Sequence, residues 1–129
     1  MKKLLLLLLC VPLIGLGQTA DDYFNKAYDY AENREYQLAI DNYTKAIRID
    51  PDYASAYYNR GLTYYNLGNY EDVIDDCTRA IRIDPDFASA YRNRGLAKAK
   101  LGLPSCSDYK KACDLGEEWC CESYNEDCK

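Results

Sequence analysis

The side chains best suited to chemistry in this sequence are its seven cysteines. Cys10 lies near the N-terminus. The other six, five of them in the C-terminal stretch that begins at Cys106, are Cys77, Cys106, Cys113, Cys120, Cys121 and Cys128. A reactive cysteine needs a basic partner or a Cys-x-x-Cys motif, and the sequence contains neither a histidine nor that motif. We therefore expect structural disulfide bonds, which form in an oxidising compartment.

The acidic residues form two groups but no comparable site. One is the pair Asp75–Asp76, and the other is Glu117, Glu118, Glu122, Glu126 and Asp127. A solvated acidic helix face accounts for both groups better than a cation site does. Histidine, the commonest general base and metal ligand, is absent, and the net charge of −5 opposes nucleic-acid binding. We expect no catalysis, no metal, no cofactor and no nucleic-acid partner.

Residues 1–17 have the layout of an export signal. Two lysines precede an apolar run from Leu4 to Gly17 that ends in small residues. The run contains Pro12 and is shorter than the ~20 residues of a membrane-spanning helix. We predict cleavage after Gly17 and no membrane span in the mature chain. A lipoprotein anchored through Cys10 is the weaker alternative.

Helices must position the remaining cysteines, and an internal repeat specifies those helices. Tyr43–Leu62 recurs along the chain as Cys77–Leu96, with the same residue at 16 of 20 positions. A period of this size, between roughly 20 and 50 residues, is typical of stacked helical units that bury their apolar faces against their neighbours. Proline disfavours helical geometry in the residue before it, so each copy ends a helix before Pro51 or Pro85.

Further residues predict how each unit is built. We expect Asp52 and Asp86 to cap the helices that follow, and Gly68 and Gly102 to form left-handed helix ends. Small residues mark the places where the two helices of a unit cross closely. On the first helices these are Ala27, Gly61 and Gly95, and on the second helices they are Ala46 and Ala80.

The C-terminal cysteines fit one more pair of antiparallel helices. The expected helices are residues 105–114 and 117–127, joined by a turn at Leu115–Gly116. Facing residues across such a turn have position numbers with a constant sum. Cys106 with Cys128 and Cys113 with Cys121 share that sum, and we predict these two disulfides. Cys77 and Cys120 are left over, and we expect Cys77 to be a buried, unpaired thiol.

The repeat resembles the tetratricopeptide repeat. The matching residues of the central copy are Tyr57, Gly61, Tyr64, Leu67, Gly68, Tyr70, Ala80 and Pro85. The resemblance implies an all-α fold, a short superhelical solenoid of stacked antiparallel helix pairs with a C-terminal capping helix. The implied domain spans residues 20–128: repeat 1 at 20–53, repeat 2 at 54–87, a shortened repeat 3 at 88–115, and the cap helix at 117–128. The stretch around Cys113–Cys121 is also similar to Sel1-like repeats, in which two cysteines spaced in this way join a helix pair.

The tetratricopeptide resemblance implies a concave groove lined by the first helix of each repeat. The residues that it assigns to the groove are Phe24, Tyr28, Ala31, Tyr58, Leu62, Tyr65, Asn66, Arg92, Leu96, Ala99 and Lys100. Tyr58 and Arg92 occupy the same place in two near-identical copies. A binding surface tolerates such a difference between copies, and so does any solvated helix face. We favour the binding surface, because tyrosine and arginine are favoured interface anchors. Some tetratricopeptide domains clamp a terminal carboxylate with basic residues, but Phe24 and Tyr28 stand at the first clamp positions here.

These observations predict an exported, non-enzymatic adaptor that binds a protein or peptide segment in its groove. The expected location is the periplasm, the cell envelope or the extracellular space. The alternative is a structural module that forms homo-oligomers through its N-terminal end, where Tyr23 and Phe24 are expected to be exposed.

Overall fold

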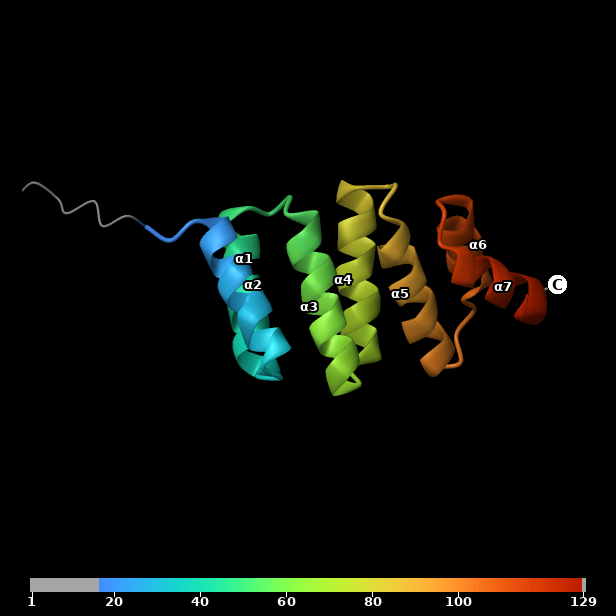
Figure 1. The fold of residues 1–129 in the computed structure, drawn as a ribbon, viewed down its shortest axis with the longest axis horizontal. Helices are drawn as coiled ribbons and strands as arrows, with labels where there is room; N and C mark the ends of the chain where they lie inside the picture. The colour runs from blue at the N-terminus through green and yellow to red at the C-terminus, as the bar shows by residue number, and fades with distance from the viewer. Residues whose placement is uncertain (1–16, 129) are drawn as a thin grey trace, which may run out of the picture.

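The structure, a computed structural model, describes residues 17–128, and all regular secondary structure in this range is helical. The helices are α1 (Ala20–Glu32), α2 (Tyr36–Ile49), α3 (Ala54–Leu67), α4 (Tyr70–Ile83), α5 (Ala88–Lys100), α6 (Cys106–Asp114) and α7 (Glu118–Asp127). They form three pairs that stack in chain order, followed by α7 at the C-terminal end (Figure 1). This confirms the predicted all-α solenoid. The predicted signal segment, residues 1–17 with Cys10, lies outside the described residues except for Gly17.

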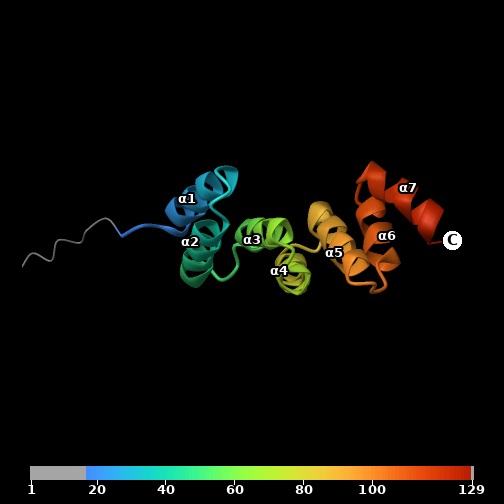
Figure 2. The same cartoon turned by 90° about the horizontal axis from the view of Figure 1, so that it is seen from below.

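No helix in the described part of the chain has the length and apolar character that crossing a bilayer requires. Figure 2 shows α1 and α3 on one side of the stack and their partners α2 and α4 on the other. The first helices of the first two units therefore share one side of the stack.

The connections between units differ in one respect from the prediction. The residues at the N-cap positions of α3 and α5 are Tyr53 and Phe87, one residue later than expected. The carboxylates that act in these turns belong to Asp50 and Asp84, which accept backbone N–H bonds from residues 52 and 86 at 3.0 and 3.1 Å. The predicted capping by Asp52 and Asp86 is wrong, because the proline turn places both aspartates before the helix start and the preceding aspartates stabilise the turn.

The turns inside the units follow the glycine pattern. Gly68 and Gly102 have φ values of +78° and +69°, in the left-handed region that glycine adopts without steric cost. In the first unit the corresponding turn places Arg34 at φ +61°. The first unit therefore forms the same turn without a glycine.

The small residues predicted at helix crossings are buried. Ala27, Ala46 and Ala80 are fully inaccessible, and Gly61 and Gly95 are buried between the two helices of their units. The two glycines differ in the space around them. A Cβ at Gly61 would meet the side chains of Asp76 and Cys77 at 3.5 and 3.6 Å, whereas a Cβ at Gly95 would lie 2.6 Å from Cε1 of Tyr109.

This difference predicts opposite effects for two matched substitutions. Gly95→Ala should destabilise the protein by about 1–3 kcal/mol, because the buried ring of Tyr109 must move and it packs edge-on against Trp119. Gly61→Ala should raise stability by roughly 0.5–1 kcal/mol, because alanine favours a helix interior and finds ordinary contact distances there. Urea unfolding followed by circular dichroism measures both. A stabilised Gly95→Ala variant would contradict this packing.

A polar joint, formed by Arg60, Asp76 and Thr44, connects the first two units. The guanidinium of Arg60 on α3 donates two hydrogen bonds to Asp76 on α4, at 2.7 and 2.8 Å, and one to the hydroxyl of Thr44 on α2 at 2.9 Å. Burial raises the pKa of the Asp76 carboxyl, and the hydrogen bonds from Arg60 oppose that rise. The prediction that Asp75–Asp76 forms a solvated acidic face is wrong for Asp76, because its side chain lies between α3 and α4 and neutralises an arginine.

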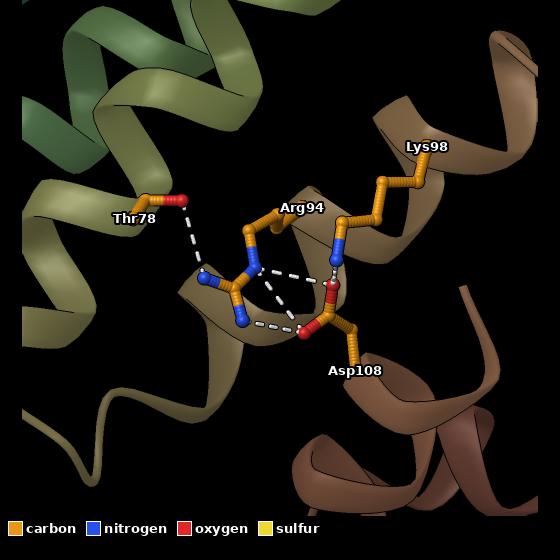
Figure 3. A network of polar contacts seen from close by, with 4 residues as sticks. All are labelled: Thr78, Arg94, Lys98 and Asp108. Atoms are coloured by element: carbon orange, nitrogen blue, oxygen red, sulfur yellow. Dashed lines mark hydrogen bonds and ion pairs between the residues drawn. The ribbon is translucent and has the colours of Figure 1, made fainter. Parts of the chain in front are cut away.

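The same joint recurs one unit later (Figure 3). Arg94 on α5 donates to both carboxylate oxygens of Asp108 on α6, at 2.6–3.2 Å, and to Thr78 on α4 at 3.1 Å. The ammonium of Lys98 lies 2.7 Å from the second oxygen of Asp108. The carboxylate of Asp108 therefore neutralises two cations inside the shortened third unit. The bond from Arg94 to Thr78 joins that unit to the second one.

Candidate binding groove

Two stripes of side chains meet between α1 and α3. Asn59, Leu62, Thr63 and Asn66 have the i, i+3, i+4, i+7 spacing that places residues on one face of a helix. On α1, Tyr28, Ala31 and Glu32 have the beginning of the same spacing. Helices α1 and α3 lie on the same side of the stack (Figure 2), and residues of both stripes line one hollow.

The surface is hollowed into a pocket of about 330 Å³. The side chains that line it are Tyr28, Ala31, Glu32, Tyr43, Asn59, Leu62, Thr63 and Asn66. Tyr43 comes from α2 and is almost fully buried, so burial raises the pKa of its phenol. Four of the predicted groove residues, Tyr28, Ala31, Leu62 and Asn66, are brought together in this pocket.

The lining suits one apolar side chain on an extended backbone. Tyr28 and Leu62 provide apolar surface, and Tyr28 remains 48% exposed in the unbound protein. Asn66 supplies an amide group able to bond a peptide backbone, and Glu32 adds a carboxylate. Asn59 contributes its amide oxygen as an acceptor, since its amide nitrogen donates to the carbonyl of Ser55 at 2.8 Å. Pockets of this kind, with apolar walls and a few polar groups, are typical of binding sites.

Two other predicted groove residues lie at the contacts between units. Phe24 of α1 stacks on Tyr53, the residue before α3, with ring centroids 5.0 Å apart. One unit later, Tyr58 of α3 meets Phe87, the residue before α5, at 4.7 Å. Both pairs join a first helix to the start of the next first helix. Phe24 and Tyr58 therefore pack between units.

Arg92 occupies the corresponding place in the third unit. Its guanidinium lies 3.0 Å from the carboxylate of Glu117, the residue before α7. The hydroxyl of Ser89 donates to the other oxygen of Glu117 at 2.8 Å. The difference between Tyr58 and Arg92 thus follows a change in the packing partner, from an aromatic ring to an acid. This contact explains the difference without a bound partner.

The remaining predicted residues spread over the same side of the stack. Tyr65 packs edge-on against Tyr70, with ring centroids 5.3 Å apart. Leu96 packs against the small core beneath α7, formed by Tyr109, Ala112 and Cys120. Ala99 and Lys100, the last two residues of α5, are exposed. The structure brings none of these four residues into the pocket between α1 and α3.

Four pocket residues were missed by sequence reasoning: Glu32, Tyr43, Asn59 and Thr63. For Asn59 and Thr63 the signal was present, because they continue the helical stripe of Leu62 and Asn66. Glu32 lies one helical turn after Tyr28 and could have been found in the same way. Tyr43 required the structure, since it belongs to a second helix and reaches the pocket from beneath.

The N-terminal end is more covered than predicted. The ammonium of Lys45 lies 5.5 Å from the centre of the Tyr23 ring. The ring of Phe24 meets Tyr43 edge-on, with centroids 5.6 Å apart, as well as stacking on Tyr53. Both rings are half-buried, so this end exposes less aromatic surface than expected, and self-association through it stays a prediction.

The C-terminal end carries the disulfides. Cys106 is bonded to Cys128, and Cys113 to Cys121, with Cα–Cα distances of 5.6 and 4.8 Å. These are the pairs that the antiparallel register predicts. Within residues 17–128 the free cysteines are Cys77 and Cys120, and both are buried. Burial raises the pKa of the Cys77 thiol to about 12 and also raises that of Cys120, so both thiols are protonated and unreactive near neutral pH.

The fold and groove define an α-helical repeat protein with a side-chain-lined pocket on the face formed by its first helices. Two family models match the sequence, one described as tetratricopeptide repeat at residues 54–87 and one as TPR repeat at residues 27–68. The chain belongs to the tetratricopeptide repeat (TPR) family. A comparison with curated protein sequences finds no match to this chain.

Solved structures show the same architecture. The second TPR domain of Spaghetti (RPAP3), bound to the HSP90 peptide SRMEEVD, is 30% identical over 76% of this chain and 93% of that one, with a TM-score of 0.73. The second TPR domain of human RPAP3, in complex with the HSP70 peptide SGPTIEEVD, is 26% identical over 83% and 92%, with a TM-score of 0.77. MamA is 33% identical over 78% of this chain and 60% of that one, with a TM-score of 0.75.

Proposed function

We propose that this protein is an exported, non-enzymatic adaptor that binds an extended peptide segment of a partner protein in the pocket between α1 and α3. The pocket itself is the observation that carries the proposal, because Tyr28 and Leu62 leave apolar surface accessible beside the polar side chains of the lining. The similar TPR domains bound to peptides support a peptide as the ligand class.

The segment that we propose is not an acidic C-terminal tail. Phe24 and Tyr28 stand where a carboxylate clamp begins, and both are aromatic. In the third unit, the positive charge of Arg92 is already matched by Glu117. Glu32 adds a negative charge at the pocket. An internal segment with an apolar side chain fits these groups better than a cluster of carboxylates does.

Two features support export. Residues 1–17 have the layout of a secretory signal, and the chain carries two disulfides of the kind that persist in oxidising compartments. We propose that the mature domain begins after Gly17 and that repeats at 20–53, 54–87 and 88–115, with the cap at 117–128, form its functional unit.

Selection from a library of displayed ten-residue peptides tests the proposed binding site. The selected peptides should bind the wild-type protein, and the variant Tyr28→Ala with Leu62→Ala should bind them about tenfold or more weakly, because central apolar contacts dominate interface energies. Leu38→Ala removes an exposed apolar side chain of α2 and serves as the matched control. The acidic peptide SRMEEVD should bind poorly.

Circular dichroism checks that each variant is folded. Equal affinities for wild type, control and pocket variant would place the binding surface elsewhere and contradict the proposal.

A further inference from the structure

One row of equivalent residues crosses all three units along the groove side and changes charge from end to end. The repeat period aligns Glu32 near the end of α1, Asn66 near the end of α3 and Lys100 at the end of α5. Glu32 and Asn66 line the pocket, and all three side chains are exposed. The row is therefore acidic in the first unit, neutral in the second and basic in the third.

The charges at the two ends of this row are free to act on a ligand. Glu32 and Lys100 take no part in the ion pairs found within residues 17–128. The neighbouring cations of the third unit are already matched, since Arg92 pairs with Glu117 at 3.0 Å and Lys98 pairs with Asp108 at 2.7 Å. Glu32 and Lys100 thus leave opposite unmatched charges at the two ends of the row.

The length of the row sets the spacing of a complementary ligand. Packed helices lie about 8–10 Å apart, so two steps along the row cover about 16–20 Å. An extended chain rises about 3.3 Å per residue, and five or six residues span that length. The apolar pocket beside Tyr28 and Leu62 lies near the acidic end.

We propose that the row Glu32–Asn66–Lys100 orients the bound peptide, selecting a segment with a basic residue five or six positions from an acidic one and an apolar residue between them, nearer the basic end. This proposal rests on the proposed function, because it assigns the ligand chemistry of the same groove. Glu32 pairs with the basic residue, Lys100 with the acidic one, and the amide of Asn66 bonds the backbone between them.

Two fluorescent ten-residue peptides of identical composition test the proposal. Both carry a central leucine, one has Lys before Glu along the chain, and the other has Glu before Lys, six positions apart. Fluorescence anisotropy in about 50 mM salt should give a roughly fivefold ratio of their Kd values for the wild-type protein, as expected for two exposed ion pairs. The charge-exchanged variant, Glu32→Lys with Lys100→Glu, should invert this ratio and prefer the other peptide. The ratio should shrink toward one in about 500 mM salt.

The outcomes separate this inference from the proposed function. If wild type and the charge-exchanged variant prefer the same peptide, or if wild type binds both equally, the orienting role is overturned while groove binding stands. A different outcome concerns the groove itself. If neither peptide binds the wild-type protein, or if the variant Tyr28→Ala with Leu62→Ala binds both peptides with unchanged Kd, the groove is not the binding site.

Discussion

Asp108→Ala is expected to destabilise the protein by about 3–5 kcal/mol, the cost typical of breaking a buried ion pair from one side. The carboxylate of Asp108 is 3% exposed and accepts hydrogen bonds from Arg94 and Lys98, so its removal leaves two cations without a partner between α5 and α6. The hydroxyl of Thr78 on α4 also loses the hydrogen bond that Arg94 donates to it when the guanidinium moves. The midpoint and slope of urea unfolding measure the change.

A matched control lies on the same helix. Asp114 of α6 bonds Lys110 at 2.8 Å, but both side chains are more than half exposed, so Asp114→Ala should leave stability unchanged within error. The combined variant Arg94→Leu, Lys98→Met and Asp108→Leu should recover most of the loss, because it removes the stranded charges together with their partner. If Asp108→Ala costs no more than Asp114→Ala, the buried joint does not stabilise the stack as described.

Loss of the disulfides is expected to be comparably severe at the C-terminal end. The loop-closure model predicts about 3.4 kcal/mol for Cys106–Cys128, which closes 22 residues, and about 2.5 kcal/mol for Cys113–Cys121, which closes eight. Helix α7 has ten residues, too few for a stable isolated helix, and its buried contact with the stack is centred on Cys120. Replacing both cysteines of a bridge by serine should therefore lower the free energy of unfolding, and the loss should be larger for Cys106–Cys128 than for Cys113–Cys121.

Hydrogen exchange locates the effect. Reduction with a phosphine should remove amide protection from α7 while α1–α4 retain theirs, because the latter are held by the Arg60–Asp76 joint and the buried alanines. Protection of α7 that survives reduction would show that side-chain packing alone holds the cap.

Much of this architecture could be predicted because its signals repeat. The repeat period and the residues before Pro51 and Pro85 specify helix pairs, and the common register of the C-terminal cysteines specifies both disulfides. The acidic partners in the polar joints were missed. One full period after Asp76 the sequence has Lys110 rather than Asp108, since the third unit is shortened, so an alignment of the repeats does not match the two aspartates.

The groove was predicted less completely than the fold. The sequence shows that Tyr58 and Arg92 differ, but it does not show that their contacts, Phe87 and Glu117, differ as well. A substitution that compensates for a change across a unit boundary has the same appearance in one sequence as a change in binding preference. The contacts in the structure distinguish these two explanations. They show that Tyr58 and Arg92 differ together with their packing partners, so the candidate binding site is the pocket between α1 and α3.

An NMR titration of the isotope-labelled protein with a peptide selected by display tests most directly whether the pocket between α1 and α3 binds a peptide. Amide shifts should change along the facing stripes of α1 and α3, around Tyr28, Leu62 and Asn66, and continue toward Lys100. The exposed positions Leu38, Arg48 and Arg82 on α2 and α4 should stay unchanged. Shifts concentrated on α2 and α4, with the α1–α3 pocket unaffected, would contradict peptide binding in this pocket.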